Sequence, residues 1–291
     1  MRKIEAGTFL NMEIPVSLSC SNDGKQVFVS FRKTEHDCYV SRIRKLGPNG
    51  AWIDFGEGAM QTVSGDGTKL LYVTAGEEGR QKLIIRDLED GKEEFLGEYL
   101  RIQELSFSED GKKLVFTAAF PLKHEPEDLP VLSEVQWIDR VKFKTDGVGL
   151  FDGTYRQIGV YDLEGGTLSI ISEGRRDLSE PGFVGNDRII YLAIPVNPDN
   201  SDDVHLYSRE LTGEKSEIWN GPGGPIGHLS VSPDQKYAAC LAHDNRYWEA
   251  TNFKIYLFDL ETGVFRCLTE DYDRSVGNYV INDTGYDRNQ Y

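Results

Sequence analysis

The chain has 291 residues, of which 39% are hydrophobic and 27% charged, so it is long enough to bury a sizeable core and has no composition typical of disorder. Its formal net charge of −16 argues against a nucleic-acid partner, because phosphate binding depends on clustered Lys and Arg. An anionic membrane surface would repel it as well. Thirty glycines and eleven prolines predict a fold with many turns and few helices.

The amino-terminal residues contain no apolar run of the length that a secretory signal needs, and no run long enough to cross a membrane. Leu18-Ser19-Cys20 looks superficially like a lipoprotein cleavage site, but polar residues and a proline interrupt the stretch before it. We therefore expect a cytoplasmic location, by elimination. Four cysteines show no CxxC spacing, fall in predicted strands and are interpreted as reduced, packed thiols, namely Cys20, Cys38, Cys240 and Cys267.

A short turn motif follows the first predicted strand, where Ser21-Asn22-Asp23-Gly24-Lys25 separates two apolar runs. Asp can accept hydrogen bonds from the backbone that follows it, and Gly can adopt the positive φ of a tight reversal, so the motif predicts a β-hairpin. The aspartate recurs at intervals of 43, 44, 77 and 47 residues, as Asp66, Asp110, Asp187 and Asp234. The long interval predicts an insertion of about 30 residues inside one repeat.

A second motif, in which an acidic residue and Leu precede a glycine, keeps the same period at residues 85–91, 160–165, 207–213 and 257–263. Each repeat therefore contains two hairpins, and a period of roughly 40–50 residues with four strands is the pattern of a β-propeller blade. We predict an all-β fold, a single β-propeller domain over residues 1–291 with five complete four-stranded blades and an unfinished sixth. The predicted blades are residues 14–52, 55–96, 97–167 with an insertion at 121–156, 168–219 and 226–269, followed by the incomplete blade 270–291.

The insertion in the third repeat concentrates aromatic and cationic side chains in an otherwise acidic chain. Long excursions from a compact repeat are often functional, which makes this segment a candidate for ligand or partner contact. The alternative is a hairpin extension on the edge of the blade, with turns at Asp146-Gly147 and Asp152-Gly153. The candidate contact residues are Trp137, Arg140, Lys142, Phe143, Lys144 and Phe151.

The same stretch carries a family resemblance. Residues 137–149, 151–153 and 158–163 resemble the third-blade insertion in propellers of the prolyl oligopeptidase family, above all in its acylaminoacyl-peptidase-like bacterial members. Residues 268–280 resemble a blade boundary that these peptidases carry well before their hydrolase domain. The Ser-x-Asp-Gly-Lys turns are shared with TolB-like propellers. The resemblance covers nearly the whole chain and implies a seven-bladed propeller followed by an α/β-hydrolase domain with a Gly-x-Ser-x-Gly nucleophile elbow.

No catalytic, cofactor or metal site is predicted. The acidic run at residues 197–203 lacks the ordered ligands, central glycine and final glutamate of an EF-hand loop. Nothing in the sequence indicates a serine within reach of His243, so the loop with Asp244, Tyr247 and Trp248 is interpreted as an ordinary polar edge loop. No Gly-x-Ser-x-Gly occurs in the 291 residues, so we expect no peptide hydrolysis from this chain alone.

Two classes of function remain. The first is the non-catalytic propeller portion of a prolyl oligopeptidase-family serine peptidase, which gates the access of short peptides to a hydrolase domain not present in these residues. The alternative is a stand-alone TolB-like propeller that binds proteins or peptides on the face formed by its blade-connecting loops. A five-bladed sugar hydrolase is a third possibility, which would need paired carboxylates at a defined separation. The expected partners are peptides or a peptidase catalytic domain.

The sixth copy of the repeat starts at Asp283-Thr284-Gly285, 49 residues after Asp234, and six residues follow it. An incomplete blade leaves backbone N–H and C=O groups unpaired at its edge. We therefore expect the chain either to close as five blades with residues 271–291 loosely attached, or to self-associate through open propeller edges.

Overall fold

The structure, a computed structural model, describes residues 7–8, 12–36, 38–120, 141, 143–145, 149–194, 203–213, 216–219 and 221–277. These residues form antiparallel β-strands joined by turns, together with the short 3₁₀ helix η2 (Trp248–Ala250). Within the described ranges, no helix is long and apolar enough to span a membrane.

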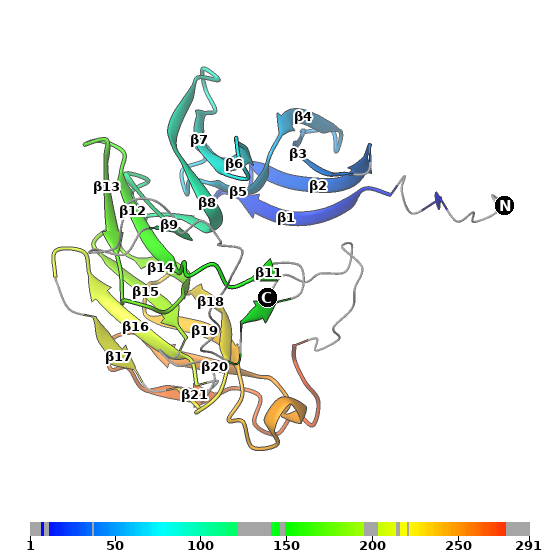
Figure 1. Cartoon of the computed structure of the whole chain (residues 1–291). Helices are drawn as coiled ribbons and strands as arrows, with labels where there is room; N and C mark the ends of the chain where they lie inside the picture. Colours follow the sequence, from blue (N-terminus) through cyan, green and yellow to red (C-terminus); the bar gives the residue numbers. More distant parts are fainter. Residues whose placement is uncertain are drawn as a thin grey trace. The chain divides into compact units, whose positions relative to one another are not determined.

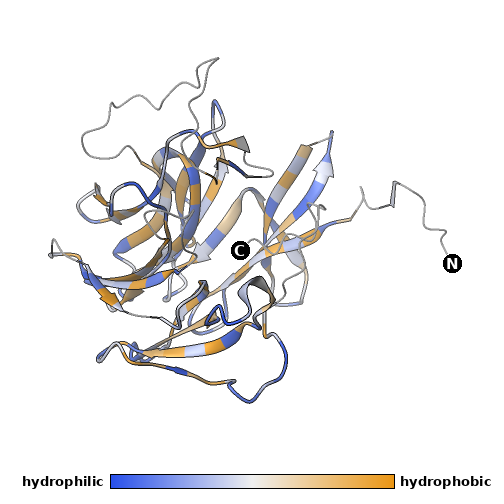
Figure 2. Ribbon diagram, turned by 60° about the horizontal axis from the view of Figure 1, so that its bottom comes forward, coloured by the Kyte–Doolittle hydropathy of each residue, from blue (hydrophilic) through white to orange (hydrophobic). Residues whose placement is uncertain are grey.

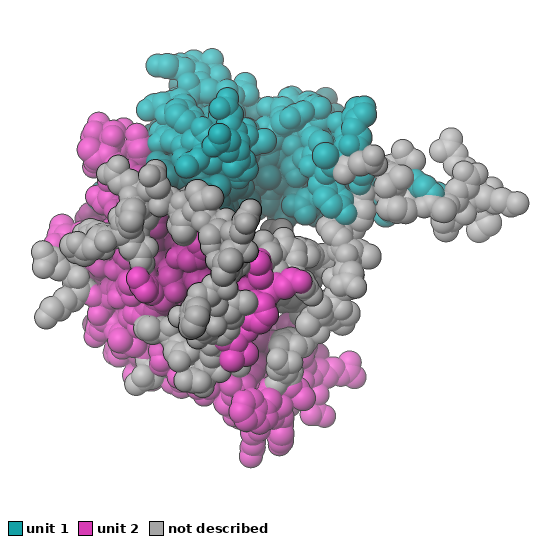
Figure 3. Space-filling view, in the orientation of Figure 1, with its two compact units in different colours: residues 1–114 teal, residues 115–291 magenta. Residues whose placement is uncertain are grey.

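The chain divides into two compact units, Met1–Leu114 and Val115–Tyr291 (Figure 3). The boundary falls inside the strand β9, in the middle of the third sequence repeat. The single domain over residues 1–291 stays a prediction.

The first unit contains two runs of four antiparallel strands, each in chain order (Figure 1). The first sheet consists of β1 (Ile14–Cys20), β2 (Val27–Glu35), β3 (Cys38–Leu46) and β4 (Trp52–Glu57). The second run consists of β5 (Ala59–Val63), β6 (Lys69–Ala75), β7 (Gln81–Asp87) and β8 (Glu93–Phe107). The first part of β8 pairs with β7, from Arg86 opposite Glu93 to Gln81 opposite Tyr99, and its second part leads into the next repeat.

The second unit repeats the same pattern. Its first strands are β9 (Lys113–Ala119), β12 (Arg156–Asp162) and β13 (Thr167–Ile171), in that order across the sheet. The next sheet consists of β14 (Leu178–Val184), β15 (Arg188–Ala193), β16 (His205–Glu210) and β17 (Glu217–Trp219). The last consists of β18 (Ile226–Val231), β19 (Tyr237–Ala242), β20 (Lys254–Asp259) and β21 (Phe265–Cys267). A separate small hairpin joins β10 (Lys144–Thr145) to β11 (Gly149–Leu150).

The prediction of an all-β fold built from four-stranded antiparallel repeats is confirmed. The observed bounds differ from the expected ones in two places. Strand β4 continues to Glu57, beyond the expected end of the first repeat at residue 52. The segment Thr167–Ile171 pairs with β12, so the fourth sheet begins at Leu178 and not near residue 168. The reason is that the turn after Asp162 returns the chain onto β12 and so completes its own repeat.

The predicted Asp-Gly turns are held by hydrogen bonds between residues two to five positions apart. In the second repeat the Ser64 hydroxyl donates to Asp66 Oδ1 at 2.6 Å, and the Thr68 N–H donates to the same oxygen at 3.0 Å. The Lys69 N–H donates to Ser64 Oγ at 3.0 Å, and Gly67 takes a φ of +75°. The same arrangement recurs at residues 21–26, 108–113 and 232–237.

These bonds stabilise the charged form of the turn aspartates. In the last repeat, the Ser232 hydroxyl and the Lys236 N–H hold the pKa of Asp234 below its usual value. In this turn Gln235 takes the left-handed conformation that glycine has in the others, with a φ of +61°. Its side-chain oxygen accepts the N–H of Gly185 at 3.0 Å, which links the turns of two neighbouring sheets.

The core of the second unit forms where neighbouring sheets face each other. Alternate residues of β19, Ala238, Cys240 and Ala242, are buried against the sheet that contains β14 to β17. Their small side chains allow close approach of the larger ones on either side, such as Phe258 and Trp219. Figure 2 shows the apolar residues as bands along the strands, with polar residues between them.

All four cysteines lie in strands, as predicted, and all are free thiols. The expectation that they are packed is wrong for two of them. Cys20 and Cys38 are exposed, because each lies at the end of its strand in the first sheet, where a side chain has few neighbours. Cys240 is buried inside the last sheet, and this burial raises the pKa of its thiol to about 12.

Candidate functional site

The candidate contact segment is the insertion between β9 and β12. Three of its six predicted residues, Trp137, Arg140 and Lys142, lie outside the described residues. The other three are on the β10–β11 hairpin or directly beside it, and are Phe143, Lys144 and Phe151.

The hairpin brings Phe143 and Phe151 together and separates both from Lys144. The Phe151 N–H donates to the Phe143 carbonyl at 2.8 Å, while Lys144 lies opposite Leu150 in the ladder. Adjacent strand residues point to opposite faces and directly opposed residues share one. The hairpin thus has one face with two phenylalanines and one with an exposed lysine and an exposed leucine.

The base of the hairpin is well anchored. The Phe151 ring meets the Tyr155 ring edge-on, with centroids 5.3 Å apart. Asp152 Oδ1 accepts the N–H of Thr154 at 2.9 Å and its hydroxyl at 2.6 Å, and Gly153 takes a φ of +82°. The predicted turn at Asp152-Gly153 is therefore confirmed, while Asp146-Gly147 falls outside the described residues.

This arrangement offers apolar and cationic contact but no proton-transfer pair. Phe143 is 39% exposed and Leu150 42% exposed, which is enough for a partner to cover them. A ligand-contact role and a hairpin extension both agree with this geometry. Across the described ranges, no three His, Cys, Asp or Glu side chains are grouped so that they could hold a metal ion.

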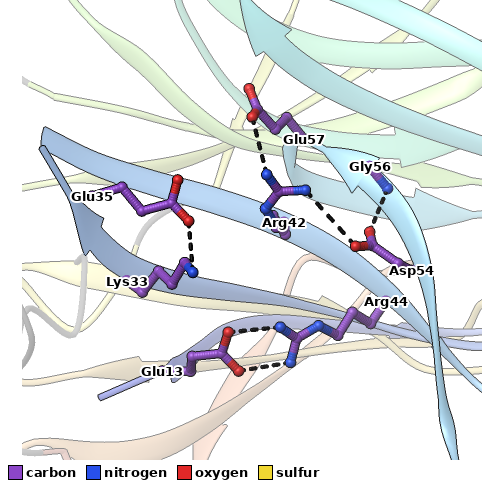
Figure 4. A network of polar contacts seen from close by, with 8 residues as sticks. All are labelled: Glu13, Lys33, Glu35, Arg42, Arg44, Asp54, Gly56 and Glu57. Atoms are coloured by element: carbon purple, nitrogen blue, oxygen red, sulfur yellow. Dashed lines mark hydrogen bonds and ion pairs between the residues drawn. The ribbon is translucent and has the colours of Figure 1, made fainter. Parts of the chain in front are cut away.

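Three cations in the strands of the first sheet are paired with carboxylates of the same sheet or of the residue just before it (Figure 4). Arg44 makes two hydrogen bonds to Glu13, at 2.7 and 2.6 Å, and its guanidinium lies 4.9 Å from the centre of the Phe31 ring. The bond from Arg44 lowers the pKa of Glu13. Two further cations are paired, Arg42 with Asp54 and Glu57, and Lys33 with Glu35. These cations are therefore poor candidates for binding an anionic ligand.

The loop between β19 and β20, residues 243–253, is the second exposed aromatic segment. It starts at His243, which is 2% exposed and lies edge-on to the Phe253 ring at 4.6 Å. The His243 Nδ1 accepts the N–H of Asn245 at 3.1 Å. A triad histidine donates a proton from Nδ1 to a carboxylate, so this bond is the reverse of what a triad needs. That this loop carries no catalytic triad stays a prediction.

Burial lowers the pKa of His243 and so favours its neutral form. A close approach of the segment between β17 and β18 contributes to this burial, together with the Phe253 ring. A Cβ built on Gly224 would come within 2.4 Å of the His243 carbonyl oxygen, so only glycine fits there. Sequence reasoning treated His243 as an ordinary loop residue and missed its role as the anchor of the loop, because the contact joins distant segments.

Two neighbouring aromatic residues of this loop point away from the core. Trp248 is 77% exposed and Tyr247 is 64% exposed. The sequence carries one signal for this exposed pair, because two large aromatic residues are adjacent in a loop and do not fit the alternating pattern of a strand.

No protein-family model matches the chain. An uncharacterised peptidase of Bacillus subtilis (strain 168), YuxL, is 25% identical over 265 residues, which cover 86% of this chain and 40% of that protein. The chain thus spans less than half the length of the curated relative that it matches.

Solved structures share the fold. The acylaminoacyl peptidase of Pyrococcus horikoshii superposes with a TM-score of 0.73 at 19% identity, over 93% of this chain and 42% of the peptidase. The β-propeller domain of the Trilobed protease from Pyrococcus furiosus gives 0.65 at 18% identity, over 95% and 77%. TolB from Acinetobacter baumannii gives 0.52 at 16% identity, over 89% and 53%. The four-stranded repeats therefore form a propeller that resembles the one in acylaminoacyl peptidase, with a more distant likeness to TolB.

Proposed function

We propose that this chain is the non-catalytic propeller portion of a serine peptidase of the prolyl oligopeptidase family, with five complete blades and part of a sixth. In this role it limits the access of peptides to a hydrolase domain encoded elsewhere in the protein. The observation that carries the proposal is the likeness to acylaminoacyl peptidase over 93% of this chain. The match to a bacterial peptidase over 265 residues supports it.

A propeller can gate a peptidase by steric exclusion alone, since a folded protein is too large to pass while a short peptide is not. The β10–β11 hairpin fits such a role because it presents exposed apolar and cationic side chains on a short anchored support. Phe143, Lys144 and Phe151 are the described residues that we propose for peptide or domain contact. Trp137, Arg140 and Lys142 belong to the same proposal from the sequence.

Reading the encoding locus beyond codon 291 is the first test. A continuous frame that encodes further blades and a Gly-x-Ser-x-Gly elbow supports the gating function. A stop codon at that point, with no hydrolase frame nearby, overturns it.

A second test uses the 291-residue chain as it is. We expect it not to cleave acylated peptide p-nitroanilides, because these residues contain no nucleophile elbow. Turnover above the buffer rate that survives further purification and is blocked by a serine-directed inhibitor would contradict the non-catalytic assignment.

A stand-alone propeller that binds proteins or peptides is the second candidate, and the likeness to TolB favours it. The two functions differ in what the hairpin contacts. Pull-down of a separate protein by the purified chain, lost when Phe143 and Lys144 are both replaced by Ser, supports the stand-alone function. Retention of that protein by the double variant counts against a binding role for the hairpin.

We also propose that the chain self-associates through open propeller edges, with further contact from an exposed apolar face of the first sheet. One face of the first sheet carries Leu18, 69% exposed, and Trp52, 45% exposed, and the strand register puts both on the same side. Covering such side chains with a second copy would remove apolar area from water. Size-exclusion chromatography with light scattering should detect a dimer or larger species, and a monodisperse monomer at high concentration would refute it.

A further inference from the structure

The loop between β19 and β20 exposes two large aromatic side chains that do not pack against the core. The indole of Trp248 makes no ring contact with any other residue in the described part of the chain, and 77% of the residue is exposed. Tyr247 beside it is 64% exposed. Large aromatic residues are enriched at binding surfaces because they offer much contact area with little loss of conformational freedom.

The loop holds these side chains on a fixed backbone. The Tyr247 N–H donates to Thr251 Oγ1 at 2.7 Å, and the Trp248 N–H donates to the Asn245 carbonyl at 3.1 Å. The short helix η2 begins at Trp248, and at its end the Thr251 N–H donates to the Trp248 carbonyl at 3.0 Å. The loop starts from the buried His243, so both of its ends are tied to the last sheet.

Trp248 has a φ of +53°, a left-handed conformation that is unusual for a bulky side chain. A glycine would adopt it without strain. The backbone conformation alone therefore does not account for a tryptophan at this position.

The charge around the aromatic pair is negative. Residues 243–254 and the segment 268–277 together carry five acidic and three basic side chains, and one of the basic ones, Lys254, donates to the Glu270 carbonyl at 3.4 Å. The two segments are joined, since the Phe253 N–H donates to Ser275 Oγ and the Val276 N–H donates to the Phe253 carbonyl. Asp244 and Glu270 are both exposed, and after the larger effects of burial and of Cys267 both help to raise the pKa of the Tyr256 hydroxyl.

The loop already contains one example of the contact that these features favour. The guanidinium carbon of Arg246 lies 5.7 Å from the centre of the Tyr247 ring, within the range of a cation–π interaction. Trp is the strongest cation–π acceptor among the side chains, and Trp248 has no cation of its own among the described residues.

We propose that the loop 243–253 binds an extended peptide segment through a Lys or Arg side chain, whose cation lies on the Trp248 indole and is attracted by Asp244 and Glu270. An acidic segment would be repelled by the same carboxylates, and a purely apolar one would gain nothing from them. The site is separate from the β10–β11 hairpin and does not depend on the proposed gating function.

The test uses the full 291-residue chain and short fluorescein-labelled peptides, read by fluorescence anisotropy. The basic probe alternates Arg with Gly, and the matched probes replace Arg by norleucine or by Glu. We expect binding of the Arg probe at low salt, weaker binding at high salt, and little binding of the other two. Equal binding of the norleucine probe would overturn the proposal, because it would show that the contact is only apolar.

Variants of the loop sharpen the test. Trp248→Ala should weaken binding of the Arg probe roughly fivefold or more, and Trp248→Phe should retain more affinity than Trp248→Leu, since only phenylalanine keeps a π face. Tyr39→Ala is the matched control, because Tyr39 is also exposed and already has a cation, Arg32, near its ring. Unchanged affinity in Trp248→Ala, or an equal loss in Tyr39→Ala, would overturn the assignment.

The carboxylates are tested separately. Asp244→Asn and Glu270→Gln should each weaken binding about twofold to threefold at low salt, and the difference should disappear at high salt because screening removes it. A loss of affinity that is the same at both salt concentrations would contradict the electrostatic part of the proposal. Because these side chains and Trp248 are exposed, circular dichroism of the variants should match that of the original chain.

Discussion

The Asp-Gly turn of the second repeat and the loop 243–253 each contain a residue in the left-handed backbone conformation, but the two residues differ in burial. Gly67 in the turn has a φ of +75°, and Trp248 in the loop has a φ of +53°. The turn hides its glycine, which is buried against the first repeat, whereas the loop exposes its tryptophan. The glycine of the turn contributes to packing between repeats, while the proposed binding role would account for a strained residue at position 248.

The largest expected effect comes from adding a side chain to the buried turn. In Gly67→Val the new Cβ would lie 3.0 Å from Gln26 Cγ and 3.2 Å from Ser21 Cβ, in addition to the strain of a positive φ. We expect the free energy of unfolding to fall by roughly 2–3 kcal/mol, measured by urea denaturation.

Gly24→Val is the matched control, because Gly24 has a φ of +69° but no atom lies within 4 Å of the point that its new Cβ would occupy. It should cost only the backbone strain, roughly 1–2 kcal/mol. An equal loss in both variants would mean that contact between the two turns does not contribute.

The second effect concerns the aspartate of the turn. Asp110 Oδ1 accepts the Ser108 hydroxyl at 2.7 Å and the Lys112 N–H at 3.0 Å, so Asp110→Ala should destabilise the chain by about 1 kcal/mol. Asp110→Asn keeps an acceptor and should lose less. The neighbouring exposed residue offers a control, Glu109→Ala, for which we expect no measurable change. Similar losses in the alanine variants of both residues would argue against the bonds as the cause.

The third effect tests the strain in the loop. Trp248→Gly removes the side chain that makes the left-handed conformation costly, and this gain is partly offset by the greater freedom of glycine in the unfolded chain. We expect a net gain in the free energy of unfolding of about 0.5 kcal/mol, together with loss of binding to the Arg probe. A destabilised Trp248→Gly would mean that the indole stabilises the fold, which would contradict the contrast drawn between the loop and the turn.

The smallest effect is a pH dependence that reports on the loop anchor. The pKa of His243 is lower in the folded chain than the usual 6.5, so below that value the unfolded chain binds more protons. Its contribution to stability is complete above about pH 6.5 and is lost as the pH falls. The urea midpoint should therefore drop between about pH 7.5 and pH 5.5, and less so in His243→Gln. Equal drops in the two proteins would exclude His243 as the source.

The sequence predicted the turns well because their hydrogen bonds join residues only a few positions apart. The tight reversal is closed by hydrogen bonds among Ser64, Asp66 and Lys69. Because this motif and the second hairpin motif recur with the same period, each repeat contains two hairpins and therefore four strands. The two hairpin motifs also gave the strand order, since consecutive antiparallel strands in a repeat pair with each other. The partial error at Thr167–Ile171 arose because an apolar run does not say which neighbour it will pair with.

The candidate site was less predictable. The aromatic and cationic composition of the insertion was visible in the sequence, but the ladder in which Phe143 lies beside Phe151 and Lys144 opposite Leu150 had to be seen in the structure. Composition does not report on the register of a short hairpin, which depends on its turn.

By itself, the sequence determined that this protein is all-β, that it repeats a four-stranded unit, and where its tight turns lie, because each of these follows from contacts between near neighbours in the chain. Only the tertiary structure decided that His243 is buried and Trp248 exposed within one short loop. The physical reason is that Gly224, about twenty residues earlier in the chain, packs against the start of the loop. Burial depends on which distant segments meet, and no local pattern encodes that.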